Sequence, residues 1–280
     1  ACSIAHKEGG NQTHVHNPIA DEAASKEHDA TWSDAIRHAL DHDGFYLSFQ
    51  PIVSLHGDTK ENYEILIRMR GEDGEEILPE KFISAAHKTD LILQLDRWVI
   101  RTALDRLAQE QANGKQLTFF IKLSEKSIAD TELQIWISEQ LKENRVTGES
   151  IVFQLSEPSA MMRLTESKGF IKAMKQLHCM VALEHFGTGV NSLNALKHLD
   201  VDYLKIDGAL IHDLTDNNES QETVKSIIQT AHSMGKLTIA EYVQDANSLA
   251  VLWQFGVNYI EGHFLQEAST ELDYDFSSED

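Results

Sequence analysis

The amino-acid sequence predicts an α/β fold, and within that class a (β/α)8 TIM-like barrel in which one strand is antiparallel. Apolar segments of strand length alternate with amphipathic segments of helix length along most of the 280 residues, and this order is typical of parallel strands joined by helical crossovers. About eight strand segments form one series, which suits a closed barrel. The first two are joined only by the turn 56–58, so we expect a hairpin there and therefore one antiparallel strand.

An open doubly wound sheet is the alternative for the same order of elements. A dinucleotide-binding sheet of that kind needs a glycine-rich GxGxxG turn between a strand and a helix. The sequence contains no such turn, and for that reason the barrel is the favoured prediction.

The boundaries of the elements follow from hydrophobic periodicity and from the turn residues between periodic segments. The first helix, 31–44, places Trp32, Ile36 and Leu40 at four-residue spacing and ends at Asp43-Gly44. Strands are expected at 47–55, 61–70, 117–124, 150–157, 180–187, 201–208, 237–243 and 257–262. Further helices are expected at 79–114, with a break near Thr89-Asp90, and at 131–144, 169–178, 192–199, 221–235 and 248–256.

Composition and charge exclude several classes of partner. The formal net charge is −21, and because a polyanion needs a basic face, no nucleic acid polymer is expected to bind. A small anionic ligand is still compatible with one local cationic pocket. No apolar run approaches the roughly 18 residues of a membrane span. Cys2 and Cys179 do not make a disulfide framework and suit a cytoplasmic location.

Charged and polar side chains gather where the predicted strands end. In a barrel the carboxyl ends of the strands form the face that carries active sites, so these residues are expected to share one pocket. A single charge at a strand end is usually only solvated, but the repeated occurrence favours a site. The residues are Glu64, Arg68, Lys122, Ser124, Gln154, Glu157, Glu184, His185, Lys205, Asp207, Glu241 and Glu261.

The same segments resemble the EAL-domain family of cyclic di-GMP phosphodiesterases and receptors, in order and spacing, from residue 31 to residue 267. The resemblance implies a barrel of the EAL type. AHKEGGN (5–11) also resembles the end of a GGDEF domain. The matching segments are FQPIVSL (49–55), YEILIR (63–68), LDRWVI (95–100), FIKLS (120–124), VFQLSE (152–157), EHFGTGVNSLNALKHLDVDYLKID (184–207), AEYV (240–243) and EGHFL (261–265).

The resemblance divides the chain into four parts. Residues 1–17 are expected to be the remnant of a GGDEF-like domain, 18–30 a polar linker, and 31–269 the EAL domain. Residues 270–280 form an acidic tail with little to bury, which we expect to be mobile.

Active members of the family hold two metal ions in a ring of Glu, Asn, Glu, Asp and Asp, completed by a Lys, a Glu and a Gln. The resemblance implies that Glu64, Lys205 and Glu241 are retained here. The other positions differ: Lys122 stands in place of Asn, Gln154 in place of Glu, Glu184-His185 in place of Asp-Asp, and Glu261 in place of Gln.

These changes predict the loss of two-metal hydrolysis. The ammonium group of Lys122 has no electron pair to donate and repels a cation. Gln154 removes an anionic ligand, and His185 supplies a softer nitrogen in place of the oxygen that magnesium prefers. We therefore expect no bound metal, no metal requirement and no enzymatic activity. We also hypothesise that Lys122 forms an ion pair with Glu64 in the former metal position.

The residues that hold the nucleotide in the family are largely retained, which implies metal-free binding of cyclic di-GMP. Arg68 can grip a phosphate through its planar guanidinium group. Leu66 and Phe186 are expected to offer an apolar floor and a stacking face. The full set of expected ligand-binding residues is Gln50, Glu64, Leu66, Arg68, Asp96, Phe186, Gly187 and Glu261.

Three functional readings from different classes remain open. The favoured one is an inactive EAL domain that binds cyclic di-GMP as a receptor and passes its occupancy to protein partners. The alternatives are a weak phosphodiesterase with an altered metal site and an interaction scaffold that binds neither nucleotide nor metal. Within the family, the likeness to a GGDEF–EAL receptor implies a PilZ-domain partner and a role in type IV pilus assembly and twitching motility. A homodimer is a further expectation from the family.

Overall fold

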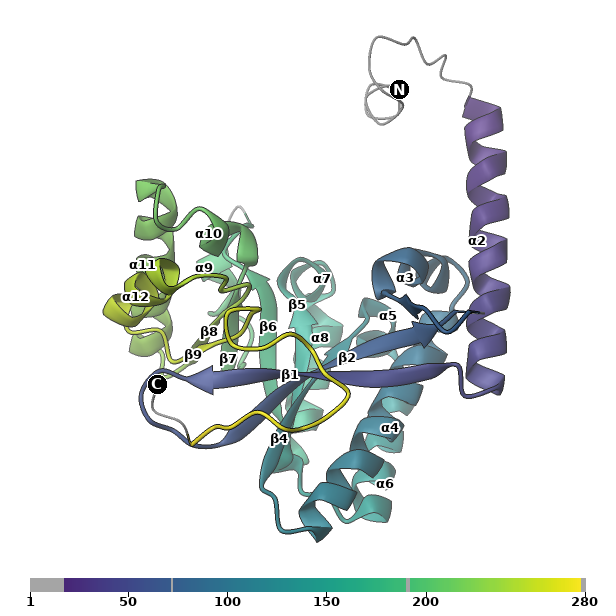
Figure 1. Cartoon of the computed structure of the whole chain (residues 1–280), viewed down its shortest axis with the longest axis horizontal. Helices are drawn as coiled ribbons and strands as arrows, with labels where there is room; N and C mark the ends of the chain where they lie inside the picture. The colour runs from purple at the N-terminus through teal and green to yellow at the C-terminus, as the bar shows by residue number, and fades with distance from the viewer. Residues whose placement is uncertain (1–17, 72, 190–191, 278–280) are drawn as a thin grey trace.

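The computed structural model describes residues 18–71, 73–189 and 192–277, and they form an eight-stranded barrel surrounded by helices (Figure 1). Neighbouring strands follow the order β1-β9-β8-β7-β6-β5-β4-β2, and pairing between β1 and β2 closes the barrel. The strands are β1 (Phe45–Ser54), β2 (Glu61–Arg70), β3 (Glu76–Ile77), β4 (Leu117–Leu123), β5 (Ile151–Ser156), β6 (Met180–Phe186), β7 (Tyr203–Ile206), β8 (Leu237–Ala240) and β9 (Tyr259–Ile260).

Helices occupy most of the connections between the parallel strands, as the alternating pattern predicted. They are α2 (Pro18–Asp41), α3 (Pro79–Lys88), α4 (Leu91–Ala112), α5 (Glu125–Ala129), α6 (Thr131–Asn144), α7 (Glu157–Met162), α8 (Leu164–Gln176), α9 (Ser192–Ala195), α10 (Gly208–His212), α11 (Asn218–Ser233) and α12 (Ala246–Phe255), with the 3-10 helix η1 at Gly148–Ser150. The predicted break after α3 is confirmed: Asp90 has a left-handed backbone (φ 60°) and separates α3 from α4.

The prediction of one antiparallel strand is confirmed. Strand β1 runs antiparallel to both of its neighbours, β2 and β9, whereas β2, β4, β5, β6, β7, β8 and β9 pair in parallel. The tight turn between β1 and β2 leaves no room for a crossover helix, so the two strands must run in opposite directions. The short strand β3 extends the edge of β2 and was too short to be predicted.

An apolar layer fills one part of the barrel interior. Its members belong to seven different strands, and most have at most 1% of their surface exposed. Because side chains at positions i and i+2 of a strand point to the same side, the residues two positions away from this layer also face inward. The members are Ile52, Phe120, Val152, Ala182, Tyr203, Ile239 and Tyr259.

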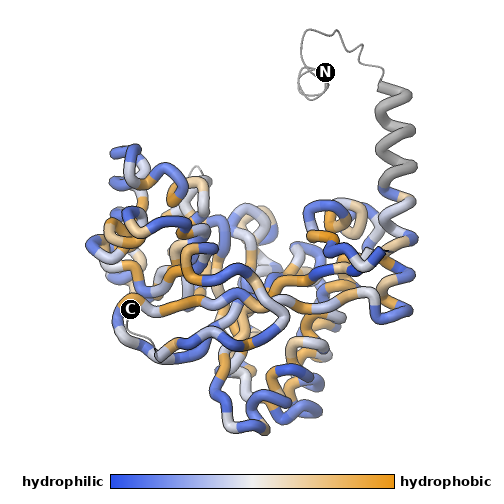
Figure 2. Tube along the Cα trace, viewed as in Figure 1, coloured by the Kyte–Doolittle hydropathy of each residue, from blue (hydrophilic) through white to orange (hydrophobic). Residues whose placement is uncertain are grey.

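The main hydrophobic core lies between the barrel and the helices around it. It joins the outward side chains of the strands, such as Phe119, Phe153 and Leu204, to the inward faces of α4, α8 and α11. Figure 2 shows apolar segments along the strands and polar segments on the outer helices and loops. Within the described ranges, no helix combines the length and apolarity that a membrane crossing requires.

Two segments differ from their predicted structure. Residues 18–30, expected as a linker, belong to helix α2, whose later residues Ile36 and Ala39 are buried against α3 and α4. In the predicted mobile tail, Leu272 is buried and Tyr274 and Phe276 pack against the main core. The hydrophobic residues of the tail, rather than its acidic ones, decide its position. Residues 1–17 and 278–280 lie outside the described ranges, so the predicted GGDEF remnant remains a prediction.

Candidate ligand-binding site

A polar layer lies above the apolar layer, at the carboxyl ends of the parallel strands. Seven of its residues stand two positions along the strand from a member of the apolar layer, and Glu64 of β2 completes the set. The spacing of two therefore places one polar side chain from each barrel strand in the interior. The polar layer consists of Gln50, Glu64, Lys122, Gln154, Glu184, Lys205, Glu241 and Glu261.

Lys205 is the buried centre of the polar layer. Its side chain has no exposed surface, and its Nζ lies 2.9 Å from Glu64 Oε1, 3.3 Å from Glu241 Oε1 and 2.9 Å from Glu261 Oε1. Burial by itself would lower the pKa of Lys205, but the three carboxylates outweigh it and raise the pKa well above the ordinary value. Lys205 is therefore a permanent cation that joins β7 to β2, β8 and β9.

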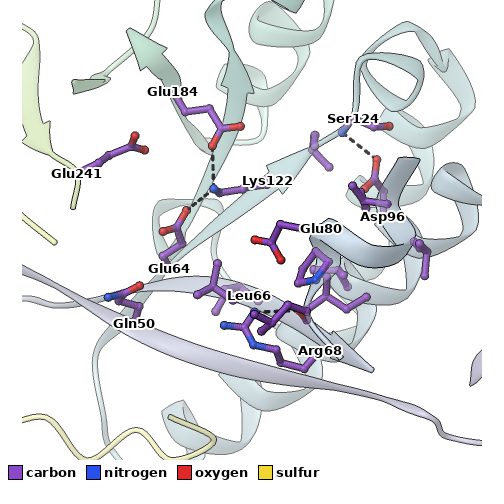
Figure 3. A pocket seen from close by; sticks show the side chains of 18 of the residues that line it. Gln50, Glu64, Leu66, Arg68, Glu80, Asp96, Lys122, Ser124, Glu184 and Glu241 are labelled. Atoms are coloured by element: carbon purple, nitrogen blue, oxygen red, sulfur yellow. Dashed lines mark hydrogen bonds and ion pairs between the residues drawn. The ribbon is translucent and has the colours of Figure 1, made fainter. Parts of the chain in front are cut away.

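Lys122 lies between two carboxylates on the cavity side of the layer. Its Nζ is 3.2 Å from Glu64 Oε1 and 3.2 Å from Glu184 Oε2, and Figure 3 shows the ammonium group between the two acids. The predicted ion pair between Lys122 and Glu64 is thus confirmed. Gln154 Nε2 also donates to Glu64 Oε1, at 3.0 Å, so Glu64 accepts contacts from three different strands.

The pKa values of the glutamates differ because the two lysines are unevenly shared. Burial would raise the pKa of Glu64, but Lys122 and Lys205 together hold it well below its usual range. Burial, followed by repulsion from Glu64, raises the pKa of Glu261 to about 8 despite the nearby Lys205. Burial also raises the pKa of Glu241. Glu64 is therefore ionised at pH 7, and Glu261 takes up a proton at a higher pH than Glu64 does.

The raised pKa of Glu261 predicts a pH-dependent stability. The folded pKa of about 8 lies above the unfolded value of about 4.3, so the unfolded state loses this proton first as pH rises. We expect the free energy of unfolding to fall between about pH 5 and pH 8, by up to roughly 1.4 kcal/mol per pH unit.

The variant Glu261→Gln keeps a neutral side chain and should lack this part of the decline. Equilibrium unfolding in urea at pH 5, 6, 7 and 8 measures it, with Glu267→Gln on an exposed residue as the control. Equal slopes for Glu261→Gln and the wild type would show that Glu261 is ionised in the folded protein at neutral pH.

The polar layer forms the floor of a cavity of about 500 Å³. Helices α3 and α4 supply its side walls. Among the sequence-predicted residues, those that line it are Gln50, Glu64, Leu66, Arg68, Asp96, Lys122, Ser124, Glu184, His185, Glu241 and Glu261. The lining does not include Gln154, Glu157, Lys205, Asp207, Phe186 or Gly187. Gln154 and Lys205 lie beneath the cavity surface, where both contact Glu64.

Besides Lys122, the described cavity lining contains a second permanently charged cation, Arg68 of β2. Its guanidinium donates from Nη1 to the carbonyl of Ile67 at 3.0 Å, and its Nε lies 3.6 Å from Glu76 Oε2. Its Nε is buried without a hydrogen-bond partner. Figure 3 places Arg68 beside Leu66 and Glu80 on one wall of the cavity. A guanidinium with unused donors suits an anionic ligand.

Gln50 and Asp96 line the cavity but already have partners in the protein. Gln50 Nε2 donates to the carbonyl of Gln266 at 3.3 Å. Asp96 accepts a hydrogen bond from the backbone N–H of Ser124 at 2.9 Å, and burial raises its pKa in spite of that bond. The carboxyl group of Asp96 therefore links α4 to the end of β4.

The structure does not support Phe186 and Gly187 as ligand contacts. The side chain of Phe186 is 0% exposed and belongs to the main core. The reason is a register shift between β6 and β7 at Leu183/Phe186, together with the left-handed backbone of His185 (φ 55°), which turns Phe186 away from the cavity. The N–H of Gly187 donates to Glu157 Oε2 at 3.2 Å. The alternating pattern of a strand in the sequence does not indicate where a register shift of this kind occurs.

Several cavity residues were missed by the sequence prediction. Leu78, Pro79 and Glu80 at the start of α3 line the cavity, as does Tyr242 after β8. Leu78 caps the start of α3, and Pro79 and Glu80 are its first two residues; no sequence motif indicated that this helix borders the site. Tyr242 had a signal, because it directly follows Glu241 in the AEYV segment, but a tyrosine in that place suggested no role.

The floor of the cavity does not fit a pair of divalent metal ions. An ammonium group stands within 3.2 Å of both Glu64 and Glu184, the acids that would have to share a cation, and it cannot act as a ligand. His185 instead places Nδ1 at 3.2 Å from Asp207 Oδ2. No group of three or more His, Cys, Asp or Glu side chains with the spacing of a metal site exists among the described residues.

The family follows from the barrel, its polar layer and a match to a family model: residues 33–268 match the model described as EAL domain, and the chain belongs to that family. It is similar to the FimX EAL domain from Pseudomonas aeruginosa bound to c-di-GMP, with 41% sequence identity and a TM-score of 0.83 over 88% of this chain and 99% of that one. It is also similar to the Xanthomonas citri FimX EAL domain in complex with c-diGMP, with 31% identity and a TM-score of 0.85 over 91% of this chain and 99% of that one.

Curated relatives include enzymes. The chain is 30% identical to the cyclic di-GMP phosphodiesterase PdeF of Escherichia coli strain K12 over 85% of its own length and 32% of that protein. The chain spans about a third of the length of the curated relatives it matches first. Membership of the family therefore does not by itself decide between binding and hydrolysis.

Proposed function

We propose that this chain is a cyclic di-GMP receptor that does not hydrolyse its ligand. The observation that carries the proposal is the position of Lys122, whose ammonium group lies between Glu64 and Glu184 on the cavity floor. In two-metal phosphodiester hydrolysis, metal ions activate the water and neutralise the phosphate. Here the ammonium group of Lys122 lies between the two acids and balances their negative charge without a metal ion. Because an ammonium group does not bind and activate a water molecule as a metal ion does, no hydrolysis is expected.

The charges of the cavity support an anionic ligand of moderate size. The four glutamates of the polar layer contact two lysines, and the raised pKa of Glu261 lets a proton offset part of the remaining negative charge. Arg68 on the opposite wall adds a guanidinium with a free donor. One phosphate can be gripped by Arg68, and Lys122, whose side chain is 42% exposed, offers a second positive group. Leu66 and Ile83 supply apolar surface for a base.

Calorimetric titration with cyclic di-GMP in the presence of EDTA tests the proposal. We expect a dissociation constant in the micromolar range or tighter, which corresponds to about 8 kcal/mol or more of binding free energy. Separation of the products after incubation with magnesium or manganese should show no linear pGpG. Production of pGpG would establish the alternative, a weak phosphodiesterase with an altered metal site. Absence of binding would favour the third reading, a scaffold without a nucleotide.

A single substitution tests whether Lys122 alone prevents metal binding or whether several changed ligand positions do so together. We expect Lys122→Asn, which returns the residue typical of active members, to produce no pGpG with manganese, because Gln154 and His185 still lack the anionic oxygens that the cation needs. Chromatography of the reaction products measures this, with the wild type as the matched control. Measurable turnover in Lys122→Asn would mean that the lysine alone blocks the metals.

The resemblance to FimX extends the proposal to partners. We carry over from it a PilZ-domain protein partner and a role in type IV pilus assembly and twitching motility, together with a cytoplasmic location. A homodimer is a further possibility that the family suggests. Size-exclusion chromatography of the chain with a purified PilZ-domain protein, with and without cyclic di-GMP, tests the partner, and failure to co-elute under both conditions would remove it.

A further inference from the structure

A second cavity, of about 400 Å³, lies along one face of helix α8. Lys168, Lys172 and Lys175 of α8 line it, and His198 and Asp200 line it from the connection between α9 and β7. The end of α8 and this connection lead directly into β6 and β7, so the cavity lies toward the amino ends of the strands. The polar layer occupies the opposite ends, and no residue lines both cavities.

The three lysines, here called the lysine row, place like charges on successive turns of one helix. Lys168 and Lys172 are four residues apart, and Lys172 and Lys175 are three residues apart. Like charges at these spacings destabilise a helix. No acidic residue stands three or four positions from Lys168 or Lys172 in the sequence, so neither lysine has an acidic neighbour on its own helix face. The stability of α8 therefore does not explain the lysine row.

Tertiary contacts neutralise only one member of the lysine row. Lys175 Nζ lies 2.7 Å from Asp202 Oδ1 and 3.7 Å from Asp200 Oδ2. Within the described ranges, Lys168 and Lys172 are exposed and have no ion pair. The chain contains 45 acidic residues and 24 lysines and arginines, so two adjacent lysines without an acidic partner stand out from the rest of the surface.

Gly169 leaves the surface of α8 bare beside Lys172. Glycine in a helix interior is destabilising relative to alanine, and a Cβ atom on residue 169 would meet no atom within 4 Å. Packing among the described residues therefore does not require a glycine here. A glycine is suited to a place where another backbone approaches closely, and this one is exposed next to two unpaired cations.

We propose that the lysine row is a docking surface for an acidic segment of a partner protein, bound in extended conformation with carboxylates at alternate positions. Lys168 and Lys172 are separated by about 6 Å along the helix axis, at about 1.5 Å per residue. Alternate side chains of an extended segment lie about 6.6 Å apart on one side of the backbone. Successive carboxylates can therefore face successive lysines.

The same geometry argues against other anionic partners. A single phosphate is held best by converging donors or by the fork of an arginine, whereas the lysine row spreads its charges along a helix. Charges separated by more than about 8 Å are largely screened at physiological ionic strength, so a short acidic segment meets mainly the lysine row. A long polyanion or an anionic bilayer would also meet the rest of a chain whose net charge is −21.

A titration of the isotope-labelled chain by NMR tests the proposal with the peptide Glu-Ser-Glu-Ser-Glu as the probe. We expect amide shifts along 168–176 and 198–200, and binding that weakens as salt is added. Lys168→Gln/Lys172→Gln should weaken binding roughly 2- to 30-fold, the range for loss of two exposed ion pairs. Gly169→Ala should raise the thermal unfolding temperature and yet weaken binding, because its methyl group stands where the peptide backbone approaches.

The matched control is Lys60→Gln/Lys142→Gln, which removes two exposed lysines outside the row and changes the net charge equally. It should bind the peptide as the wild type does. Equal losses in both double variants, or no shifts on α8 in the wild type, would overturn the proposal. Phosphate or phosphatidylserine vesicles that shift the α8 amides when the peptide does not would also overturn it.

This docking surface is independent of the proposed receptor function. Because no residue lines both cavities, Lys168→Gln/Lys172→Gln should retain the wild-type affinity for cyclic di-GMP in calorimetry. A loss of that affinity would show that the two lysines act on the ligand cavity rather than on a separate partner, and would overturn the proposal.

Discussion

Replacement of Lys205 by methionine is expected to lower the free energy of unfolding by about 3–5 kcal/mol at pH 7, the loss typical of breaking a buried ion pair by removing one partner. Methionine retains the length and most of the volume of the side chain but leaves three buried carboxyl groups, Glu64, Glu241 and Glu261, without their shared cation. Lys205 has no exposed surface, so water cannot replace it. Equilibrium unfolding in guanidinium chloride measures the loss.

The pH dependence of this variant identifies the cause. The pKa values of Glu241 and Glu261 are already raised by burial, and without Lys205 they should lie still further above their unfolded values, so stability is present at low pH and is lost as pH rises. The control is Arg37→Met, which breaks an ion pair with Asp34 whose side chains are 54% and 81% exposed; it should cost less than about 1 kcal/mol. If Lys205→Met lowers the free energy of unfolding by no more than Arg37→Met does, the stability of the polar layer does not depend on its central cation.

The second large effect concerns the ligand. Arg68→Ala should weaken cyclic di-GMP binding at least tenfold, because it removes a charge-assisted contact of about 1.5–3 kcal/mol to a phosphate. Among the described residues, the guanidinium donates to the carbonyl of Ile67 and lies 3.6 Å from Glu76, whose side chain is 49% exposed, so its removal leaves no buried charge of opposite sign unpaired. Calorimetry of the variant in EDTA provides the measurement.

Arg70, two residues further along β2, offers a matched control. Its guanidinium lies over the ring of Tyr46, 5.1 Å from the centroid, and it does not line the cavity. Arg70→Ala changes the net charge by the same amount and should leave affinity within about twofold at physiological salt. Equal losses in both variants would indicate that long-range charge, rather than a contact by Arg68, governs binding.

The sequence predicted the barrel and its polar layer because both follow from a periodicity of two. An inward apolar residue such as Val152, followed two positions later by Gln154, is visible in the printed sequence. The parallel arrangement then requires the carboxyl ends of the strands to meet. The ion pair between Lys122 and Glu64 was predictable for the same reason, since both positions belong to neighbouring strands of one ring.

Other features depend on tertiary structure that local patterns do not contain. The register shift before Phe186 changes which side chain faces the cavity. Helix α2 starts earlier than expected because a polar segment can continue a helix whose apolar face begins only near Ile36. The tail residues Leu272 and Phe276 find a surface on the barrel, where Phe276 contacts the ring of Tyr63 at 5.2 Å. Composition had suggested only mobility.

Crystals grown with cyclic di-GMP and manganese, measured for the anomalous signal of manganese, show whether Lys122 or metal ions occupy the space between the glutamates of the cavity floor. We expect nucleotide density in the cavity, the ammonium group of Lys122 between Glu64 and Glu184, and no anomalous peak on the cavity floor. Two manganese peaks between those glutamates, with Lys122 turned away, would contradict this expectation.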